Sequence, residues 1–225
     1  MAFKPAPRVT EPLSAAVVAC RFAGLGANLA VVPETDAPIE ETLVAVSLLG
    51  MEEDDLRLLS LLAHWLELHR AHVHAERLVR QVAAERSPRV RAFWAAIGSR
   101  DRRLGRLVPL HEGEPIDLLR AGSVQQLARR GEDPRVARTA LRVPAGTLRS
   151  RDSDLQPAAL VVARHAGLRN RVKMGPGCRA DVWTLLEADP TLTPSTAARR
   201  AGCSFAAAWQ VVQDFALWRM ATDNG

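Results

Sequence analysis

The stretch 179–219 constrains the fold more than any other part of the chain, because it predicts three consecutive helices with short connections. Apolar residues recur at helical spacing over 180–188, over 194–201 and again from 205 to about 218. Connections of this length leave few ways to arrange the helices. The sequence therefore predicts a small three-helix unit in this part of the chain.

The residues at the helix boundaries support this division. Thr193 is a typical N-cap, and Pro194 is favoured at the first helical position that follows. Gly202 can adopt the positive φ that a tight corner between two helices requires. Ser204 is expected to cap the third helix.

The second and third predicted helices resemble the helix-turn-helix family position by position. Ala198 matches the small residue of the family's second helix, and Gly202 matches the turn glycine four residues later. Apolar residues occupy the family's core positions: Ala197, Ala201, Cys203, Ala208 and Val211. The resemblance implies DNA binding with the third helix in the major groove. The alternative is an ordinary three-helix corner that does not contact DNA.

The longer stretch 169–217 contains an Arg-x-Arg pair, a glycine-containing segment and the run RADVWTLL. In these features it resembles small bacterial regulators encoded beside nucleotidyltransferase-type toxins in abortive-infection systems. The resemblance implies a DNA-binding antitoxin or autorepressor, associated with phage defence, that also contacts a protein partner such as a toxin. It does not account for residues 1–150.

Positive charge is concentrated in the middle of the chain. Residues 86–180 contain twenty Lys or Arg against eight Asp or Glu, whereas 1–85 contain seven against twelve and 181–225 three against five. Every cation of the middle segment except Lys173 is an arginine, whose guanidinium binds phosphate through paired donors. This favours nucleic-acid contact. A solvated arginine-rich surface is one alternative, and RNA or single-strand binding by 86–151 is another.

Predicted DNA contacts form two groups. A basic segment, 167–179, is expected to be a loop that leads into the three-helix unit. Its cations and two from the second helix are the predicted phosphate contacts: Arg169, Arg171, Lys173, Arg179, Arg199 and Arg200. Uncharged residues near the start of the third helix are predicted to face the groove: Ser204, Gln210 and Gln213.

The third helix also carries a feature that favours a protein partner. It has no cation on the face predicted to contact DNA, and its aromatic residues form a candidate docking surface: Phe205, Trp209 and Trp218. The alternative function is therefore a helix-turn-helix adaptor subunit that binds a protein within a larger, nucleic-acid-handling assembly.

The whole chain predicts a mainly α-helical fold in two parts. A helical N-terminal body, 1–150, includes a basic and partly irregular segment at 99–151. The helix-turn-helix domain follows at 151–225, and the few residues after Trp218 predict that it is wingless or only partly winged. The body is expected to serve homodimerisation or partner contact.

Local patterns within residues 99–151 predict three further features. Residues 108–119 favour a β-hairpin or extended pair, and 140–144 favours an edge strand. Between them, a short helix is expected to be capped by Ser123 and closed by Gly131.

Other motifs argue against catalysis and metal binding. The chain has no phosphate-binding glycine loop, no nucleophile elbow and no tyrosine, so we predict no catalytic residues, no enzyme activity and no cofactor. The four histidines within 64–74 lack metal-ligand spacing, so no metal is expected. Three scattered cysteines and the absence of an export signal or long apolar run predict a cytoplasmic protein that does not enter membranes.

Overall fold

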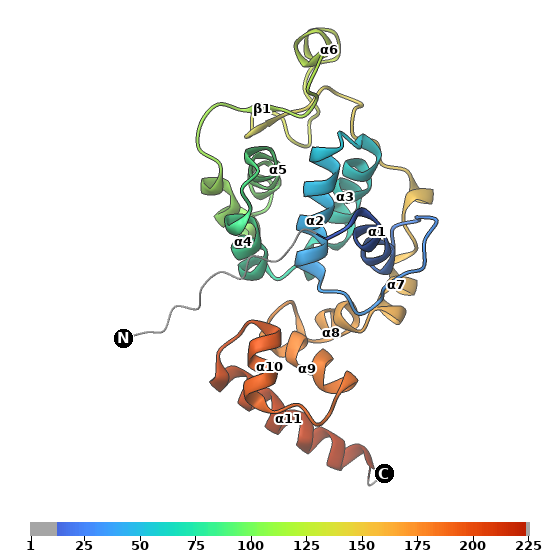
Figure 1. Cartoon of the computed structure of the whole chain (residues 1–225), viewed down its shortest axis with the longest axis vertical. Coiled ribbons are helices and arrows are strands. Elements are labelled where there is room, and N and C mark those ends of the chain that lie inside the picture. Colours follow the sequence, from blue (N-terminus) through green and yellow to red (C-terminus); the bar gives the residue numbers. More distant parts are fainter. Residues whose placement is uncertain (1–12, 224–225) are drawn as a thin grey trace.

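The computed structural model describes residues 13–223, and in this range the prediction of a mainly α-helical chain is confirmed. The α-helices are α1 (Ala15–Gly24), α2 (Ile39–Glu52), α3 (Leu56–His69), α4 (Ala75–Ala84), α5 (Pro88–Gly98), α6 (Ser123–Arg130), α7 (Ala158–Arg164), α8 (Ala166–Met174), α9 (Cys178–Ala188), α10 (Pro194–Ala201) and α11 (Phe205–Asp223). Shorter elements are the 3-10 helices η1 (Arg70–His72), η2 (Arg102–Leu110) and η3 (Asp152–Asp154) and the strands β1 (Ile116–Asp117) and β2 (Leu141–Arg142). The molecule is elongated, with β1 and α6 at one end of its long axis and α9, α10 and α11 at the other (Figure 1).

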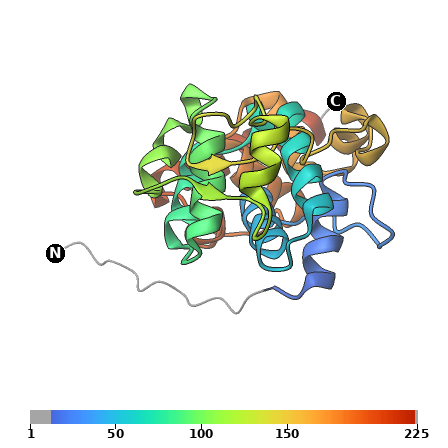
Figure 2. The same cartoon turned by 90° about the horizontal axis from the view of Figure 1, so that it is seen from above.

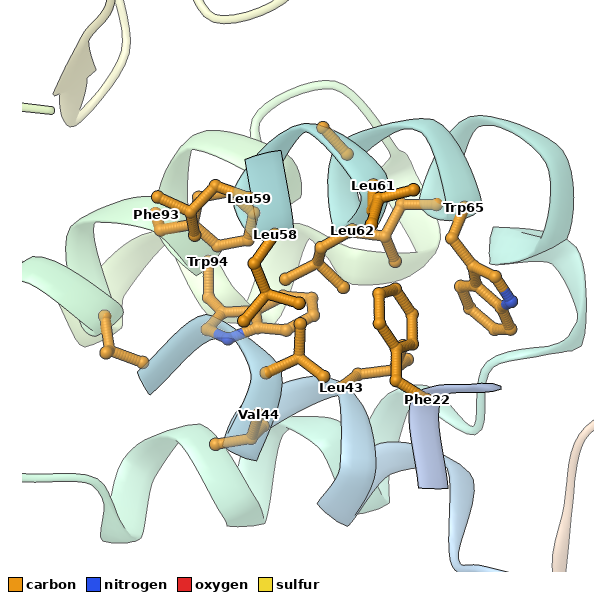
Figure 3. Packing of buried hydrophobic residues seen from close by; sticks show 14 of the residues in the cluster. Phe22, Leu43, Val44, Leu58, Leu59, Leu61, Leu62, Trp65, Phe93 and Trp94 are labelled. Carbon is orange, nitrogen blue, oxygen red and sulfur yellow. The ribbon is translucent and has the colours of Figure 1, made fainter. Parts of the chain in front are cut away.

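A large apolar core holds the first five helices together. Its biggest side chains, Trp65, Trp94, Phe22 and Phe93, are fully buried, and Figure 3 shows them packed with leucines of α2 and α3. Buried indole N–H groups need acceptors. Trp65 Nε1 donates to the carbonyl of Leu25 at 2.8 Å, and Trp94 Nε1 donates to the hydroxyl of a buried serine of α2 at 2.9 Å. These bonds fix the orientation of both rings within the core.

The chain between α5 and α7, residues 99–157, covers one end of this core. Strands β1 and β2 pair in parallel, with Ile116 opposite Leu141, so the strand predicted within 140–144 is present. The hairpin predicted within 108–119 is not formed, because 102–110 is the 3-10 helix η2 and β1 pairs with β2 instead. Seen from above, the strands and α6 lie over the helices of the core (Figure 2).

Helix α6 differs from its prediction only in its cap. It begins after Gly122, which has a φ of 76°, and the hydroxyl of Ser123 donates to the carbonyl of Leu119 instead of capping the helix. Gly131 closes the helix as expected, with a φ of 71°. A left-handed residue on each side of α6 explains the abrupt turns at both ends.

Helices α9, α10 and α11 pack around a second, smaller core. Its buried residues are Val182, Leu186, Ala197, Ala198, Ala201, Ala208, Val211 and Phe215. The predicted boundary residues behave as expected: Thr193 Oγ1 accepts from the N–H of Thr196 at 3.3 Å, and Ser204 Oγ accepts from that of Ala207 at 3.2 Å. Gly202 has a φ of 64° at the corner between α10 and α11. Small alanines on α10 let the two helices approach closely.

The segment that precedes this unit is helical. Residues 167–174, predicted as part of a basic loop, lie in α8, which ends at Gly175 with a φ of 81°. Val161 and Leu168, from α7 and α8, belong to the large N-terminal core, and the second core begins only at Val182. The two cores therefore divide between Leu168 and Val182. The predicted domain boundary at 150/151 stays a prediction.

No helix within residues 13–223 combines the length and the apolar character that crossing a membrane requires.

Candidate nucleic-acid interface and the ionic network behind it

The outward face of α11 is uncharged and partly aromatic. Phe205 and Trp209 are 56% and 47% exposed, and Gln213 lies one turn further along the same side. Ser204 and Gln210 are also exposed, although the Gln210 amide donates to Asp214 Oδ1 at 3.0 Å. Hydroxyl and amide groups can hydrogen-bond base edges, whereas exposed rings favour contact with apolar surfaces. This face can therefore serve either kind of partner.

Trp218 does not belong to that face. It follows Phe205 by thirteen residues, which places it on another side of the helix. Its ring centroid lies 5.5 Å from that of Trp183 and 5.6 Å from that of Phe215. The three aromatic residues proposed from the sequence as one docking surface are thus divided between two sides of α11.

The six predicted phosphate contacts differ in their exposure and in whether an acidic residue already pairs with them. Lys173, Arg199 and Arg200 are exposed, and none of them has a side-chain hydrogen bond or ion pair within residues 13–223. Arg199 and Arg200 occupy the last turn of α10, next to the Gly202 corner. These three side chains can bind an anion without breaking an existing contact.

Arg169 and Arg179 are paired but partly exposed. Arg169 Nη2 lies 3.0 Å from Glu187 Oε2. Arg179 Nη1 lies 2.5 Å from Asp214 Oδ2, and its guanidinium lies over the ring of Trp183. The hydrogen bonds from Arg179 and Gln210 lower the pKa of Asp214 below its ordinary value. Because exposed ion pairs are weak, a phosphate could compete for either arginine.

Arg171 is buried, and we remove it from the set of predicted phosphate contacts. Its side chain is 2% exposed. The guanidinium donates to both oxygens of Glu40 (2.6 and 2.9 Å), twice to Asp181 Oδ1 (3.0 and 2.8 Å) and to the carbonyl of His72 (3.1 Å). A guanidinium has five N–H donors, and each has an acceptor here. This arginine therefore has no donor left for a ligand.

The contacts of Arg171 are part of an ionic network that joins helices of the N-terminal body to α8 and α9. Glu40 comes from α2 and is fully buried, whereas Asp181 comes from α9. Arg77 of α4 adds a second cation, with Nη2 2.9 Å from Asp181 Oδ2 and Nη1 3.9 Å from Glu40 Oε2. His74 contributes its backbone N–H to Glu40 and its ring to Asp181. Two carboxylates and two guanidinium groups thus balance one another.

The protonation states follow from this balance. Burial alone would raise the pKa of Asp181, but the hydrogen bond from His74 and the charges of Arg171 and Arg77 outweigh it and lower that pKa. Burial alone would lower the pKa of Arg171, but Glu40 and Asp181 outweigh it and raise that pKa above its ordinary value. Both groups are therefore charged throughout the neutral range.

Two arginines of α4 hold the corner between α10 and α11. Arg77 donates to the carbonyl of Ala201, and Arg80 Nη2 donates to that of Gly202 at 3.1 Å. Carbonyls at a helix C-terminus carry partial negative charge, so cations are favoured there. This contact could not be predicted from local patterns, because the partners are more than 120 residues apart.

Comparison of the chain with protein-family models, with curated proteins and with solved structures gives no match.

Proposed function

We propose that the three-helix unit binds duplex DNA as a helix-turn-helix regulator, with the start of α11 in the major groove. One observation carries the proposal: the exposed, uncharged start of α11 follows the Gly202 corner, and the unpaired Arg199 and Arg200 lie just before that corner, on the last turn of α10. In this arrangement, Ser204 and Gln213 face base edges, and the two arginines contact phosphates beside the groove.

Lys173 would add a further phosphate contact from the end of α8, and Arg169 and Arg179 would exchange their carboxylate partners for phosphates. Each such exchange replaces one exposed ion pair with another, so its net contribution is small. The free cations are therefore expected to dominate the electrostatic part of binding. In keeping with the resemblance to antitoxin-type regulators, the proposed target is the promoter region of the protein's own gene.

Arg199→Ala combined with Arg200→Ala is expected to weaken duplex binding by roughly tenfold or more at low salt. Because two phosphate contacts are lost, the slope of log K against log salt should fall by about 1.8. Fluorescence anisotropy at four salt concentrations measures both quantities, with the promoter region of the gene and a scrambled duplex as ligands.

The matched control is Arg102→Ala combined with Arg164→Ala. These residues are exposed and unpaired within residues 13–223, but they lie outside the three-helix unit. The control removes the same net charge and should leave the salt slope unchanged. Equal losses of duplex affinity in both double variants would contradict the proposal, because binding would then depend on the net charge of the protein and not on the position of the two arginines in the unit.

The exposed aromatic residues of α11 favour a second candidate function, an adaptor that docks on a protein partner. Phe205 and Trp209 lie one turn apart, and large exposed aromatics are frequent anchors of protein interfaces. The partner that the resemblance suggests is a toxin encoded by an adjacent gene. In this case α11 would bury its rings against that protein.

Trp209→Ala distinguishes the two functions. For an adaptor, the affinity for the adjacent gene's product should fall about thirtyfold, as is typical of a buried aromatic anchor, while DNA affinity stays unchanged. Val124→Ala on α6 is the control, because Val124 is an exposed apolar residue outside the unit. Co-purification and anisotropy provide the two readouts. Loss of DNA binding alone would leave the regulator as the function.

A further inference from the structure

A cleft of about 440 Å³ lies at the end of the molecule opposite to the three-helix unit. It is formed by the start of α3, by α6 and by the segment 146–151, which lies between β2 and η3 in the chain. Figure 1 shows α6 at the end of the molecule opposite to α9, α10 and α11. Four arginines contribute to its lining: Arg57, Arg130, Arg149 and Arg151. Four arginines against a single carboxylate, Asp154, make the lining strongly basic.

The positions of these arginines in their elements direct them to the same space. On α6, Gln126 and Arg130 are four residues apart and share one helix face. On α3, Arg57 and Ser60 are three residues apart and also share a face. All four residues line the cleft, so two helices present a matching side to it.

The segment 146–151, which follows β2, also directs two arginines to the cleft. Arg149 and Arg151 line the cleft, whereas the hydroxyl of Ser150 between them lies 3.5 Å from Glu67 on another side of the chain. Alternation of this kind is characteristic of extended backbone. The N–H of Arg149 donates to Ser60 Oγ at 3.1 Å, and this bond fixes the segment against α3.

None of the four guanidinium groups has a hydrogen bond or ion pair within residues 13–223. Asp154 is the one carboxylate in the lining. Arg135 shows the contrast, because its guanidinium is paired with both Asp133 and Glu67. Four unpaired cations around one cleft repel one another, and an anion bound between them would offset that repulsion.

We propose that this cleft binds a small ligand that carries at least two phosphate groups, of the size of a nucleotide. Guanidinium groups bind phosphate oxygens through paired donors, and the volume lies within the range of small-molecule sites. Leu56 and Leu119 provide apolar surface, and Thr147 and Asp154 provide hydrogen-bonding groups for the rest of the ligand. The arginines converge on one volume instead of following a strip, which favours a compact ligand over a nucleic-acid chain.

Calorimetric titration of the full chain with ATP and with inorganic tripolyphosphate tests the proposal. Both are expected to bind with micromolar dissociation constants at low salt, and AMP is expected to bind more weakly. Arg149→Gln combined with Arg151→Gln should weaken ATP and tripolyphosphate binding at least tenfold, because two charge-assisted contacts are lost. Tighter binding of ATP than of tripolyphosphate would add the nucleoside to the recognised groups.

The control variant combines Arg102→Gln with Arg129→Gln. Arg129 is the neighbour of Arg130 on α6, yet neither control residue lines the cleft, so affinity should change less than twofold. Three results would overturn the proposal: no binding of either polyphosphate at millimolar concentration, equal losses in both double variants, or binding of single-stranded RNA or duplex DNA alone. The helix-turn-helix proposal is independent of each, since its residues lie at the other end of the molecule.

Discussion

Arg171→Ala is expected to lower the free energy of unfolding by about 3–5 kcal/mol, the usual consequence of removing one partner from a buried ion pair. The substitution leaves Glu40 fully buried and Asp181 largely buried, each without the guanidinium that balanced its charge. Arg77 remains near both carboxylates, but its closest approach to Glu40 is 3.9 Å. For a domain of this size the midpoint of thermal unfolding should fall by about 6–20 °C. Urea and thermal denaturation followed by circular dichroism measure the two quantities.

Two companion variants show whether the effect comes from burial and geometry. Arg169→Ala on the same helix breaks a partly exposed pair with Glu187 and should cost only about 0–1 kcal/mol. Arg171→Lys keeps the charge, but an ammonium group has three donors and cannot replace the five hydrogen bonds of the guanidinium, so an intermediate loss is expected. A loss below about 1 kcal/mol for Arg171→Ala would contradict the importance of the network.

The same substitution should also loosen the three-helix unit from the N-terminal body. The network joins α2 and α4 to α8 and α9 and continues through Arg77 to the carbonyl of Ala201. The exposed residues around Gly175, between α8 and α9, lie beside this junction. Limited proteolysis there should accelerate in Arg171→Ala more than in Arg169→Ala.

Arg171 shows where the sequence stops being informative. Arg169 and Arg171 form an Arg-x-Arg pair beside the predicted helix-turn-helix unit, and the residues around them do not indicate which of the two is buried. The structure distinguishes them, because Arg169 pairs with Glu187 on the next helix, α9, at a separation of 18 residues, whereas Arg171 pairs with Glu40 at a separation of 131 residues. Burial of a charge depends on such distant partners, and one sequence does not reveal them.

The local features were predictable for the opposite reason. The caps at Thr193 and Ser204 and the corner at Gly202 depend on backbone geometry within a few residues, so residue type alone indicated them. The arginine cleft could be predicted only in part. The cations were evident in the sequence, but their convergence requires α3, α6 and the segment after β2 to meet. What remains a prediction is the ligand of α11.

The second large effect concerns pH, and it arises from buried histidines. Burial lowers the pKa of His165 to about 4; the charge of Arg171 acts in the same direction, whereas the backbone hydrogen bond of Ala37 and the charge of Asp36 only partly oppose it. Burial also lowers the pKa of His69 to about 4, and the neighbouring His72 and His64 act in the same direction. Both histidines bind a proton at about pH 6.5 when the chain is unfolded but remain neutral in the folded protein. The unfolded state therefore binds more protons below pH 6.5, and stability is lost as the pH falls from 6.5 towards 4. The lowered pKa of Asp181 acts only below its ordinary value of 3.8, outside this window.

Lowering the pH from 7 to 5 is expected to reduce the free energy of unfolding by about 2 kcal/mol for each of these histidines, or about 4 kcal/mol together. Urea denaturation at the two pH values measures the loss. His165→Asn keeps an acceptor for the N–H of Leu168, which His165 Nδ1 accepts at 3.2 Å, but it cannot titrate. His69→Phe keeps a ring against Trp65. Each variant should reduce the pH dependence, and a part should remain in both because burial also lowers the pKa of His72. An unchanged dependence in both would show that His165 and His69 are protonated equally in the folded and unfolded chain.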